Sequence, residues 1–266
     1  MARIQLIKIV LTACIAVSVV HSDESDRREW TVDGVKREAL VVPPAMQAGT
    51  PAPVVFAFHG HGGSMQNSAR KFNMENLWPE ALLVCMQGLN TPGKFDPSGE
   101  RAGWQKYVGD QGDRDLKFFD QVLATLKKEY SIDEKRVYAT GHSNGGGFTY
   151  VLWAARGDVF AAVAPSAGGA GGKIAALRPL PAMHIAGEND ERVPYETQKR
   201  AMAAIRTLNG CKDEGEPWAT AGTLVGTLYS SDSGTPFVSV VYPGGHAFPS
   251  EAPDLIVKFF KNHTKK

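Results

Sequence analysis

The sequence contains few cysteines and no excess of charge of one sign. Only three cysteines occur in 266 residues, and one of them, Cys14, lies near the N-terminus. The remaining two, Cys85 and Cys211, are too few for a metal site. The formal net charge is +1, and no cluster of lysine and arginine stands out beyond the last two residues. We therefore expect no metal and no nucleic-acid partner.

The chain also lacks low-complexity segments, internal repeats and an interior linker. Its composition, 43% hydrophobic and 21% charged with 28 glycines and 16 prolines, is typical of globular proteins. A length of 266 residues suits one large domain. We therefore predict a single domain over residues 23–266.

An apolar run distinguishes the first 22 residues from the rest. Arg3 and Lys8 give a basic start, residues 9–20 are largely apolar, and the acidic Asp23 follows His21 and Ser22. This order predicts a secretory signal peptide over residues 1–22. Its removal takes away two bases and no acids, so the net charge changes from +1 to −1. We expect a secreted or periplasmic protein.

Two other interpretations of this segment are weaker. An uncleaved membrane anchor would need a longer apolar run, so we expect no stable membrane insertion after signal removal. Residues 11–14 (Leu-Thr-Ala-Cys) resemble a lipoprotein-processing box. Lys8 interrupts the apolar stretch before that box, and residues 15–20 continue it afterwards.

Strand-like and helix-like patterns alternate along the chain. Residues 29–43 contain two strand-like runs around Asp33-Gly34, a pair that favours a hairpin turn. Residues 54–58 are continuously apolar, as in a parallel strand buried on both faces. Further strands are expected at residues 82–86, 136–140, 160–164, 182–186 and 237–242, and helices at residues 115–130, 145–155, 195–208 and 253–262. The alternation predicts an α/β fold with a mostly parallel sheet flanked by helices.

Residues 141–145 read Gly-His-Ser-Asn-Gly, which fits the pattern G-x-S-x-G. Strand-like sequence precedes the motif and helix-compatible sequence follows it. In a nucleophile elbow the serine stands on a sharp turn, and its neighbours two positions away must be glycine because the backbone is crowded there. The helix that starts there also points its positive end at developing negative charge. We interpret Ser143 as a nucleophile; the alternative is an ordinary glycine-rich turn.

A serine nucleophile needs a base, and a carboxylate to hold that base. In this type of elbow the histidine comes last along the chain. Three histidines follow Ser143. His184 lies within an expected strand, and His263 lies four residues from the end. His246 follows a tight glycine loop just past an apolar strand, so we predict His246 as the base.

The acid should lie beyond a strand between the serine and the histidine. Residues 187–195 form an acidic loop after the strand at 182–186, with Glu188, Asp190 and Glu191 as candidates. We favour Asp190, because Gly-x-x-Asp followed by Val-Pro recurs in hydrolases of this type. Glu188 is the second choice, and a solvated acidic loop explains the others.

A glycine-rich turn, His-Gly-His-Gly-Gly, occupies residues 59–63 directly after an expected strand. Such a turn can present backbone N–H groups to an oxyanion. We assign this role to the N–H groups of His61 and Asn144, with Gly62 as an open alternative to His61. A plain strand-end turn is the other interpretation. A metal site at His59 and His61 is rejected, because carboxylates at suitable spacing are missing.

Two aromatic residues are candidates for binding a substrate. Trp104 lies in a polar, glycine-rich segment and is either a wall of an acyl pocket or a structural core residue. Phe248 follows His246 closely and is a second candidate wall. We expect the pocket shape to depend on loops around residues 91–113 and 212–236. Cys85 is expected to be a buried structural thiol, and a Cys85–Cys211 disulfide is left open.

Five motifs together carry a family resemblance over residues 54–260. They are His-Gly-x-Gly-Gly-Ser at 59–64, the run from 130 to the elbow at 141–146, Phe-Ala-Ala-Val-Ala at 160–164, Gly-x-x-Asp-x-x-Val-Pro-Tyr at 187–195, and Gly-Gly-His at 244–246. In these motifs the chain resembles the secreted esterases that include polyhydroxybutyrate depolymerases, feruloyl esterases and acetylxylan esterases. The resemblance implies the α/β-hydrolase fold and a serine esterase without cofactor, with Ser143 as nucleophile, Asp190 as acid and His246 as base.

The chain departs from that family in two places. Asn209-Gly210-Cys211 resembles the first half of a family disulfide, but residues 229–231, where the partner would fall, contain no cysteine. Ala247-Phe248 replaces the Thr-Trp that commonly follows the histidine. The first departure implies that Cys211 is free or differently paired. The second, together with the lack of a separate polymer-binding module, speaks against a polymer substrate and favours a small or oligomeric ester of feruloyl, acetyl-polysaccharide or 3-hydroxybutyrate type.

Two other functions are carried as alternatives. One is a peptidase of the prolyl-oligopeptidase superfamily, although a mature chain of about 244 residues leaves no room for the large extra domain such enzymes usually carry. The other is a non-catalytic secreted binding protein on the same scaffold. The presence of all three candidate catalytic residues argues against the latter.

Overall fold

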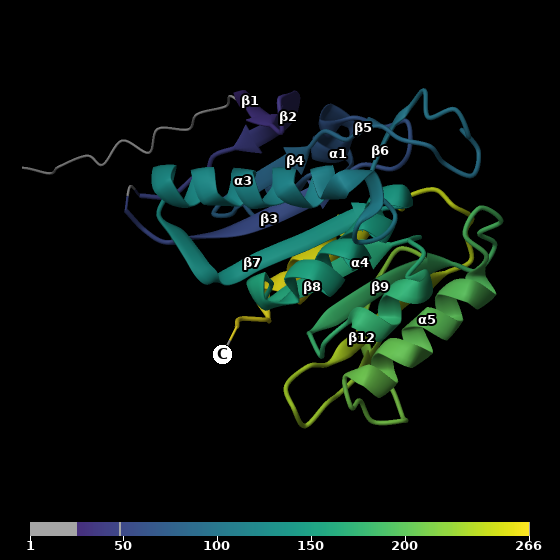
Figure 1. Cartoon of the computed structure of the whole chain (residues 1–266). Coiled ribbons are helices and arrows are strands. Elements are labelled where there is room, and N and C mark those ends of the chain that lie inside the picture. The colour runs from purple at the N-terminus through teal and green to yellow at the C-terminus, as the bar shows by residue number, and fades with distance from the viewer. Residues whose placement is uncertain (1–25, 48, 266) are drawn as a thin grey trace, which may run out of the picture.

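The computed structural model describes residues 26–47 and 49–265 (Figure 1). The predicted signal peptide, residues 1–22, lies outside the described residues. The architecture is the predicted one, an α/β-hydrolase fold in which helices cover both faces of a mostly parallel sheet.

Six parallel strands form the centre of the sheet, and antiparallel strands extend it at both edges. The strand order is β1-β2-β4-β3-β7-β8-β9-β12-β11-β10, in which β4 to β12 pair in parallel. The strands are β1 (Asp26–Val32), β2 (Val35–Val42), β3 (Ala52–Phe58), β4 (Leu82–Met86), β7 (Ile132–His142), β8 (Ala162–Ser166), β9 (Ala182–Gly187), β10 (Glu216–Ala221), β11 (Leu224–Tyr229) and β12 (Phe237–Tyr242). A separate pair joins β5 (Leu89–Asn90) and β6 (Ala102–Gly103).

Side chains of each central strand alternate between two apolar layers. In β3, Phe56 and Phe58 pack in the layer under α3, α4 and α5, whereas Val55 and Ala57 face α1, α2 and α6. Both faces of β3 are therefore buried among apolar residues, which explains the unbroken apolar run in the sequence of this strand. The helices are α1 (Met65–Phe72), α2 (Met74–Leu77), α3 (Arg114–Glu129), α4 (Asn144–Arg156), α5 (Tyr195–Leu208) and α6 (Ala252–Lys261).

The sheet has an edge that the sequence did not predict. Residues expected to form a loop after α5 contain β10 and β11, a hairpin that pairs with β12. All six residues of β10 are exposed or only partly buried. An edge strand of this kind lacks the apolar pattern by which interior strands are recognised.

The two described cysteines are both free. Cys85 is buried in the layer of α1 and α6, whereas Cys211 packs against the opposite layer. The sheet therefore separates the two thiols, and the pairing left open above does not form. Cys211 instead forms a β-bridge with Ser231, within the segment where the family resemblance places a second cysteine.

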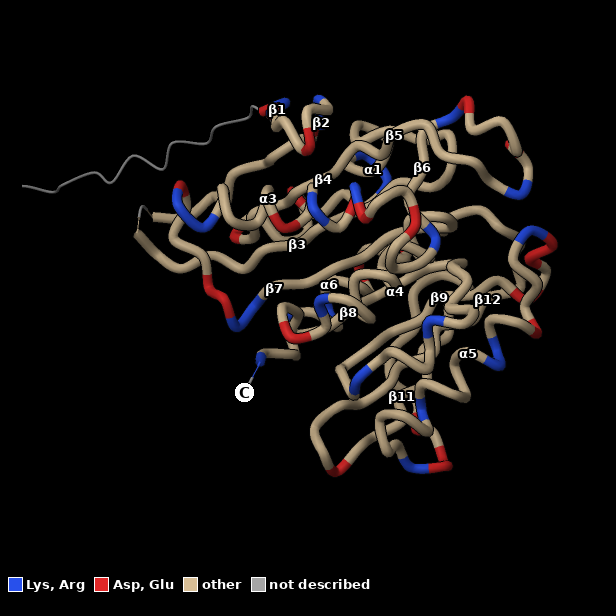
Figure 2. Tube along the Cα trace, viewed as in Figure 1, with Lys and Arg blue, Asp and Glu red and all other residues tan. Residues whose placement is uncertain are grey.

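Charged residues are dispersed over the described part of the molecule. Figure 2 shows lysine and arginine interspersed with aspartate and glutamate along the trace. One pair is internal: Arg37 Nη2 lies 2.7 Å from Asp115 Oδ1, and both side chains are buried. Between residues 26 and 265, position 48 aside, no helix is long and apolar enough to cross a membrane.

Candidate active site

The predicted strand-to-helix turn lies between β7 and α4, with Ser143 at its apex. Ser143 has φ 58° and ψ −119°, a conformation that L-residues rarely adopt. A Cβ atom on Gly141 would overlap the carbonyl of Gly145, and one on Gly145 would overlap the carbonyl of Phe58. The two glycines of the motif are therefore required by close backbone contacts.

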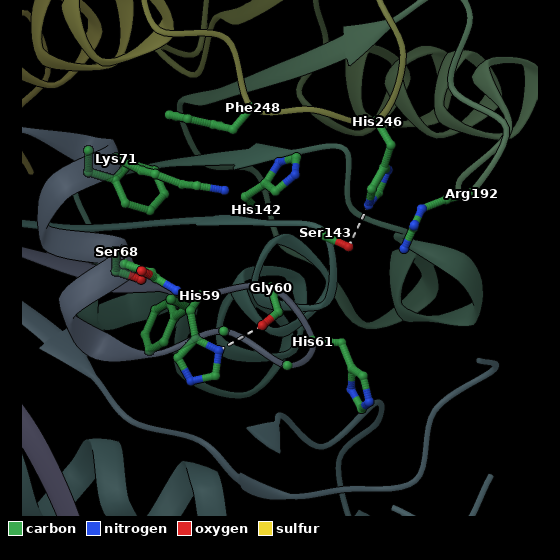
Figure 3. A pocket seen from close by; sticks show the side chains of 15 residues that line it. His59, Gly60, His61, Ser68, Lys71, His142, Ser143, Arg192, His246 and Phe248 are labelled. Carbon is green, nitrogen blue, oxygen red and sulfur yellow. Dashed lines mark hydrogen bonds between the residues drawn. The ribbon is translucent and has the colours of Figure 1, made fainter. Parts of the chain in front are cut away.

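A continuous hydrogen-bonded chain joins Ser143, His246 and Asp190. His246 Nε2 lies 2.7 Å from Ser143 Oγ (Figure 3). His246 Nδ1 lies 2.9 Å from Asp190 Oδ2. Asp190 follows β9 and His246 follows β12, so the carboxyl ends of parallel strands bring the side chains together. Because a carboxylate only accepts, the Nδ1 proton of His246 points to Asp190, and Nε2 is left to accept from the serine.

The loop after β9 holds Asp190 in place. The backbone N–H groups of Arg192 and Val193 both donate to Asp190 Oδ1 at 2.9 Å. The carboxylate is buried, with 4% of the residue exposed. Glu188 and Glu191 in the same loop are exposed. Of the three acidic candidates, Asp190 is therefore the one within hydrogen-bonding distance of His246.

A buried polar chain extends behind Asp190. Gln198 Nε2 donates to Asp190 Oδ2 at 3.2 Å and to Val193 O at 2.7 Å. The amide oxygen of Gln198 therefore faces His184 Nε2, which donates to it at 2.8 Å. The remaining ring nitrogen, Nδ1 of His184, accepts from the hydroxyl of Tyr150 at 2.7 Å. His184 is thus a satisfied buried residue, as its position within a strand suggested, but it is also linked to Asp190.

Two backbone N–H groups near Ser143 have no partner within the described chain. They belong to His61 and Asn144, whereas the N–H of Gly62 donates to Ala102 O at 2.7 Å. The imidazole of His61 is directed away from Ser143 (Figure 3). Its Nε2 atom lies 2.9 Å from Asp96 Oδ2. This difference in backbone bonding favours His61 over Gly62, the choice that the sequence left open.

Trp104 is a core residue, so its interpretation as a pocket wall is wrong. The indole is fully buried, stacks on Phe148 at 5.1 Å and donates from Nε1 to His59 O at 2.8 Å. Its backbone N–H donates to Asn144 Oδ1 at 2.7 Å, which anchors the first residue of α4. Apolar neighbours and a partner for the indole N–H explain why so large a side chain is buried in a polar, glycine-rich segment.

The pocket at Ser143 has a volume of about 300 Å³ and is bounded mainly by the turn after β3, by α1 and by the loop after β12. Phe248 lines it as expected, with its ring 4.9 Å from that of Phe72. The segments 91–113 and 212–236, which we expected to shape the pocket, contribute none of the lining residues. Helix α1 supplies that wall instead, through Asn67, Ser68, Lys71 and Phe72.

Helix α1 was not among the predicted helices, although its sequence has a helix cap and helical spacing of apolar residues. Ser64 caps the helix by accepting a hydrogen bond from the N–H of Asn67 at 3.2 Å. Met65, Ala69 and Phe72 then recur at helical spacing and are buried. The helix has only eight residues, which makes its periodicity short and easy to miss.

Two histidines beside Ser143 have depressed pKa values. Burial is the main cause that lowers the pKa of His142 to about 3, and the charges of His246 and Lys71 act in the same direction. Burial likewise lowers the pKa of His59 to about 4. Both rings are therefore neutral at ordinary pH. The His142 ring lies 5.2 Å from that of His246 and forms part of the pocket wall.

Comparison with known proteins identifies the family. The chain is 30% identical to feruloyl esterase C of Emericella nidulans over 231 residues, which covers 83% of this chain and 82% of that protein. It is 31% identical to a probable feruloyl esterase C of Aspergillus clavatus over 217 residues, 78% of this chain and 76% of that protein. The chain belongs to the feruloyl esterase C family. It is a carboxylic ester hydrolase.

Two further comparisons relate the chain to proteins outside the feruloyl esterase C family. The acetyl xylan esterase of Aspergillus awamori superposes with a TM-score of 0.68 at 13% identity, covering 89% of this chain and 99% of that one. The model of the prolyl oligopeptidase family matches residues 101–170. That segment contains α3, β7, the turn at Ser143, α4 and the whole of β8. The match therefore covers the element that α/β-hydrolases share.

Proposed function

We propose that this protein is a serine esterase in which Ser143, His246 and Asp190 form the catalytic triad. The proposal rests on one observation above all, the continuous hydrogen-bonded chain from Ser143 Oγ through His246 to the buried carboxylate of Asp190. The family membership supports an ester as substrate.

Each triad residue has a defined task in the proposed reaction. Ser143 Oγ attacks the ester carbonyl while His246 Nε2 takes its proton. Asp190 keeps the other imidazole proton on Nδ1 and stabilises the imidazolium. His246 then returns the proton to the leaving alcohol, and water attacks the acyl-enzyme by the same route in reverse. No cofactor takes part.

The oxyanion is assigned to the N–H groups of His61 and Asn144. Neither group donates a hydrogen bond within residues 26–47 and 49–265, and Asn144 opens α4, whose dipole favours negative charge. Donors that are already oriented stabilise the tetrahedral intermediate without rearrangement. The Asn144 side chain, fixed by Trp104, helps to hold the second donor in place.

The pocket supports a small or oligomeric ester. A volume of about 300 Å³ with aromatic walls at Phe72 and Phe248 accommodates an acyl group of modest size. Relatives named for feruloyl esters, and a structural neighbour named for acetyl xylan, make feruloyl and acetyl-polysaccharide esters the first candidates. Esters of 3-hydroxybutyrate are the third. Secretion through a signal peptide at residues 1–22 is part of the proposal.

The experiment that tests the proposal is hydrolysis by the mature protein, residues 23–266, of a panel of esters. The panel comprises p-nitrophenyl acetate and butyrate, methyl ferulate, acetylated xylan and 3-hydroxybutyrate oligomers, with peptide anilides included because of the prolyl oligopeptidase match. We expect ester hydrolysis that Ser143→Ala abolishes and weak or no anilide hydrolysis. Retained activity in Ser143→Ala, or cleavage of anilides alone, would overturn it.

A further inference from the structure

Two cations and no carboxylate line the pocket at Ser143; the carboxylates of Asp190 and Asp96 lie behind the lining and are hydrogen-bonded to His246 and His61. Of the 15 residues that line it, Lys71 and Arg192 are cations and none is Asp or Glu. Among residues 26–47 and 49–265, neither cation forms an ion pair. Figure 3 shows them on opposite sides of Ser143. A cavity with this balance of charge favours an anionic group in the ligand.

The Lys71 side of the pocket also holds polar groups that have no protein partner. Ser68 is buried, with 2% of the residue exposed, and its hydroxyl has no hydrogen-bond partner in the described chain. Asn67 uses its side-chain oxygen to accept from Arg70, which leaves its amide hydrogens available. A buried hydroxyl without a partner is unfavourable unless a ligand supplies one.

These groups occupy one face of α1. Asn67 and Lys71 are four residues apart, and Ser68 and Lys71 are three apart, so the three side chains are neighbours on the helix surface. All three line the pocket. The positive charge of Lys71 also acts on His142, the residue next to Ser143, because it contributes to lowering the pKa of that histidine. Lys71 and Asn67 bring an ammonium and an amide group to the pocket lining, and the Ser68 hydroxyl is buried next to them on the same helix.

Arg192, on the other side, has a different environment. Its guanidinium lies 5.8 Å from the ring centroid of Phe95, and Phe95 is 65% exposed. Its backbone N–H is already committed to Asp190. Among the described residues, the one buried hydroxyl without a partner is that of Ser68, which lies on the same helix as Lys71 and not in the loop of Arg192. The α1 side is therefore the better anion site.

We propose that the esterase acts on esters that carry a carboxylate within a few carbon atoms of the scissile bond, and that Lys71, Ser68 and Asn67 bind this carboxylate. The inference rests on the proposed function and names its substrate class. A carboxylate accepts hydrogen bonds from all three groups and satisfies the Ser68 hydroxyl. The carboxylate can belong to the acyl half, as in a hemiester of a diacid, or to the alcohol half, as in an ester of a hydroxy acid.

The test compares charged esters with neutral esters of matched shape. On the acyl side the pair is mono-p-nitrophenyl glutarate and p-nitrophenyl valerate; on the alcohol side it is 3-acetoxybutyrate and 3-acetoxybutyramide. The quantity measured is the ratio of kcat/KM for the charged ester to that for the neutral one, with Ser143→Ala correcting for spontaneous hydrolysis. We expect a ratio well above one in at least one pair, and that pair identifies the half that carries the charge. Ratios at or below one in both pairs overturn the proposal.

Variants then locate the binding groups. Lys71→Met should lower the ratio by about tenfold, the effect of one charge-assisted hydrogen bond in a site open to solvent. Lys94→Met is the matched control, since Lys94 lies near Phe95 and outside the pocket lining; it should leave the ratio unchanged. If Arg192→Met removes the preference and Lys71→Met does not, the assignment to α1 is wrong.

The Ser68→Ala variant distinguishes a role of Ser68 in binding the substrate from a role in stabilising the fold. The substitution removes a buried hydroxyl that lacks a partner, so the protein should be at least as heat-stable as the parent. The charge preference should nevertheless fall. An unchanged ratio would remove Ser68 from the site, and a lower melting temperature would show a structural role instead.

The two proposals fail in different ways. If the protein hydrolyses the neutral esters through Ser143 but treats both members of each pair alike, only the substrate inference fails. If Ser143→Ala retains activity on the neutral esters, the proposed function itself fails.

Discussion

Gln198 donates a hydrogen bond to Asp190 Oδ2, the same carboxylate oxygen that lies 2.9 Å from His246 Nδ1. The same amide receives the Nε2 proton of His184, whose Nδ1 accepts from Tyr150. The amide nitrogen of Gln198 faces two acceptors, Asp190 Oδ2 and the carbonyl oxygen of Val193. This orientation of the amide fixes the direction of every hydrogen bond in the buried chain. Gln198 is therefore a positioning residue for Asp190, and through it for His246.

Replacing Gln198 should slow catalysis more than it weakens substrate binding. In Gln198→Leu, Asp190 loses one of its donors and the imidazole of His184 loses its acceptor. We expect kcat for p-nitrophenyl acetate to fall by about tenfold, the effect of one net hydrogen bond, with little change in KM. Steady-state kinetics measure both quantities.

Two controls accompany this prediction. Lys199→Leu alters the neighbouring exposed position on α5 and should leave the kinetics unchanged. Tyr150→Phe removes the far end of the chain and should have a smaller effect than Gln198→Leu. Equal losses of kcat in Tyr150→Phe and Gln198→Leu would argue for a general loss of packing instead of positioning.

The elbow glycines should tolerate no side chain. A Cβ at position 145 would overlap the carbonyl of Phe58, so Gly145→Ala should destabilise the fold by about 3 kcal/mol or more, as overpacking does. Gly147→Ala is a matched control in the same helix, where the nearest atom to an added Cβ lies at 3.8 Å. It should be neutral or stabilising, by up to about 1 kcal/mol. Urea unfolding compares them, and equal stability of the two variants would contradict the elbow geometry.

Breaking the buried Arg37–Asp115 pair should lower the free energy of unfolding. Asp115 also accepts from the N–H of Gln105, next to Trp104, so the pair organises the segment that anchors Asn144. Arg37→Met removes the closer of the two cations beside this buried carboxylate, since Arg114 Nε remains at 3.9 Å, and should cost about 3 kcal/mol. The exposed pair of Lys117 and Asp33 is the control, for which Lys117→Met should cost less than about 1 kcal/mol. Similar costs for both, measured by denaturant unfolding, would refute this.

Stability should fall as the solution is acidified below about pH 6.5. Burial lowers the pKa of His142 to about 3 and those of His59 and His184 to about 4, from an ordinary value of 6.5. The unfolded chain therefore binds protons that the folded chain does not. The stabilisation is complete above pH 6.5 and is lost as the pH falls toward the folded-state values.

The pH dependence can be assigned to single residues. Each histidine contributes a slope of about 1.4 kcal/mol per pH unit between its folded and unfolded pKa values. Unfolding free energies measured between pH 7 and pH 5 should thus decrease, and His184→Gln should show a shallower decrease than the parent. A slope unaffected by that substitution would contradict a neutral His184 in the folded protein.

Most of the fold could be predicted because its central strands are buried on both faces. The apolar run of β3 and the glycines around Ser143 follow from constraints within a few residues. The unpredicted parts depend on contacts far apart in sequence. Whether Trp104 lies in the core or a pocket is decided by Phe148 and by the carbonyl of His59, 44 and 45 residues away. Likewise, the role of α1 as a pocket wall depends on the contact between Phe72 and Phe248, which are far apart in sequence.

Covalent labelling of the mature protein with a fluorophosphonate, followed by peptide mass spectrometry, tests the nucleophilic role of Ser143 directly. We expect one adduct per chain, on Ser143, with loss of ester hydrolysis in proportion to labelling. Ser143→Ala should not be labelled, and Ser250→Ala, which changes an exposed serine, should be labelled like the parent. Labelling at another residue, or full hydrolysis by a protein blocked at Ser143, would contradict the account.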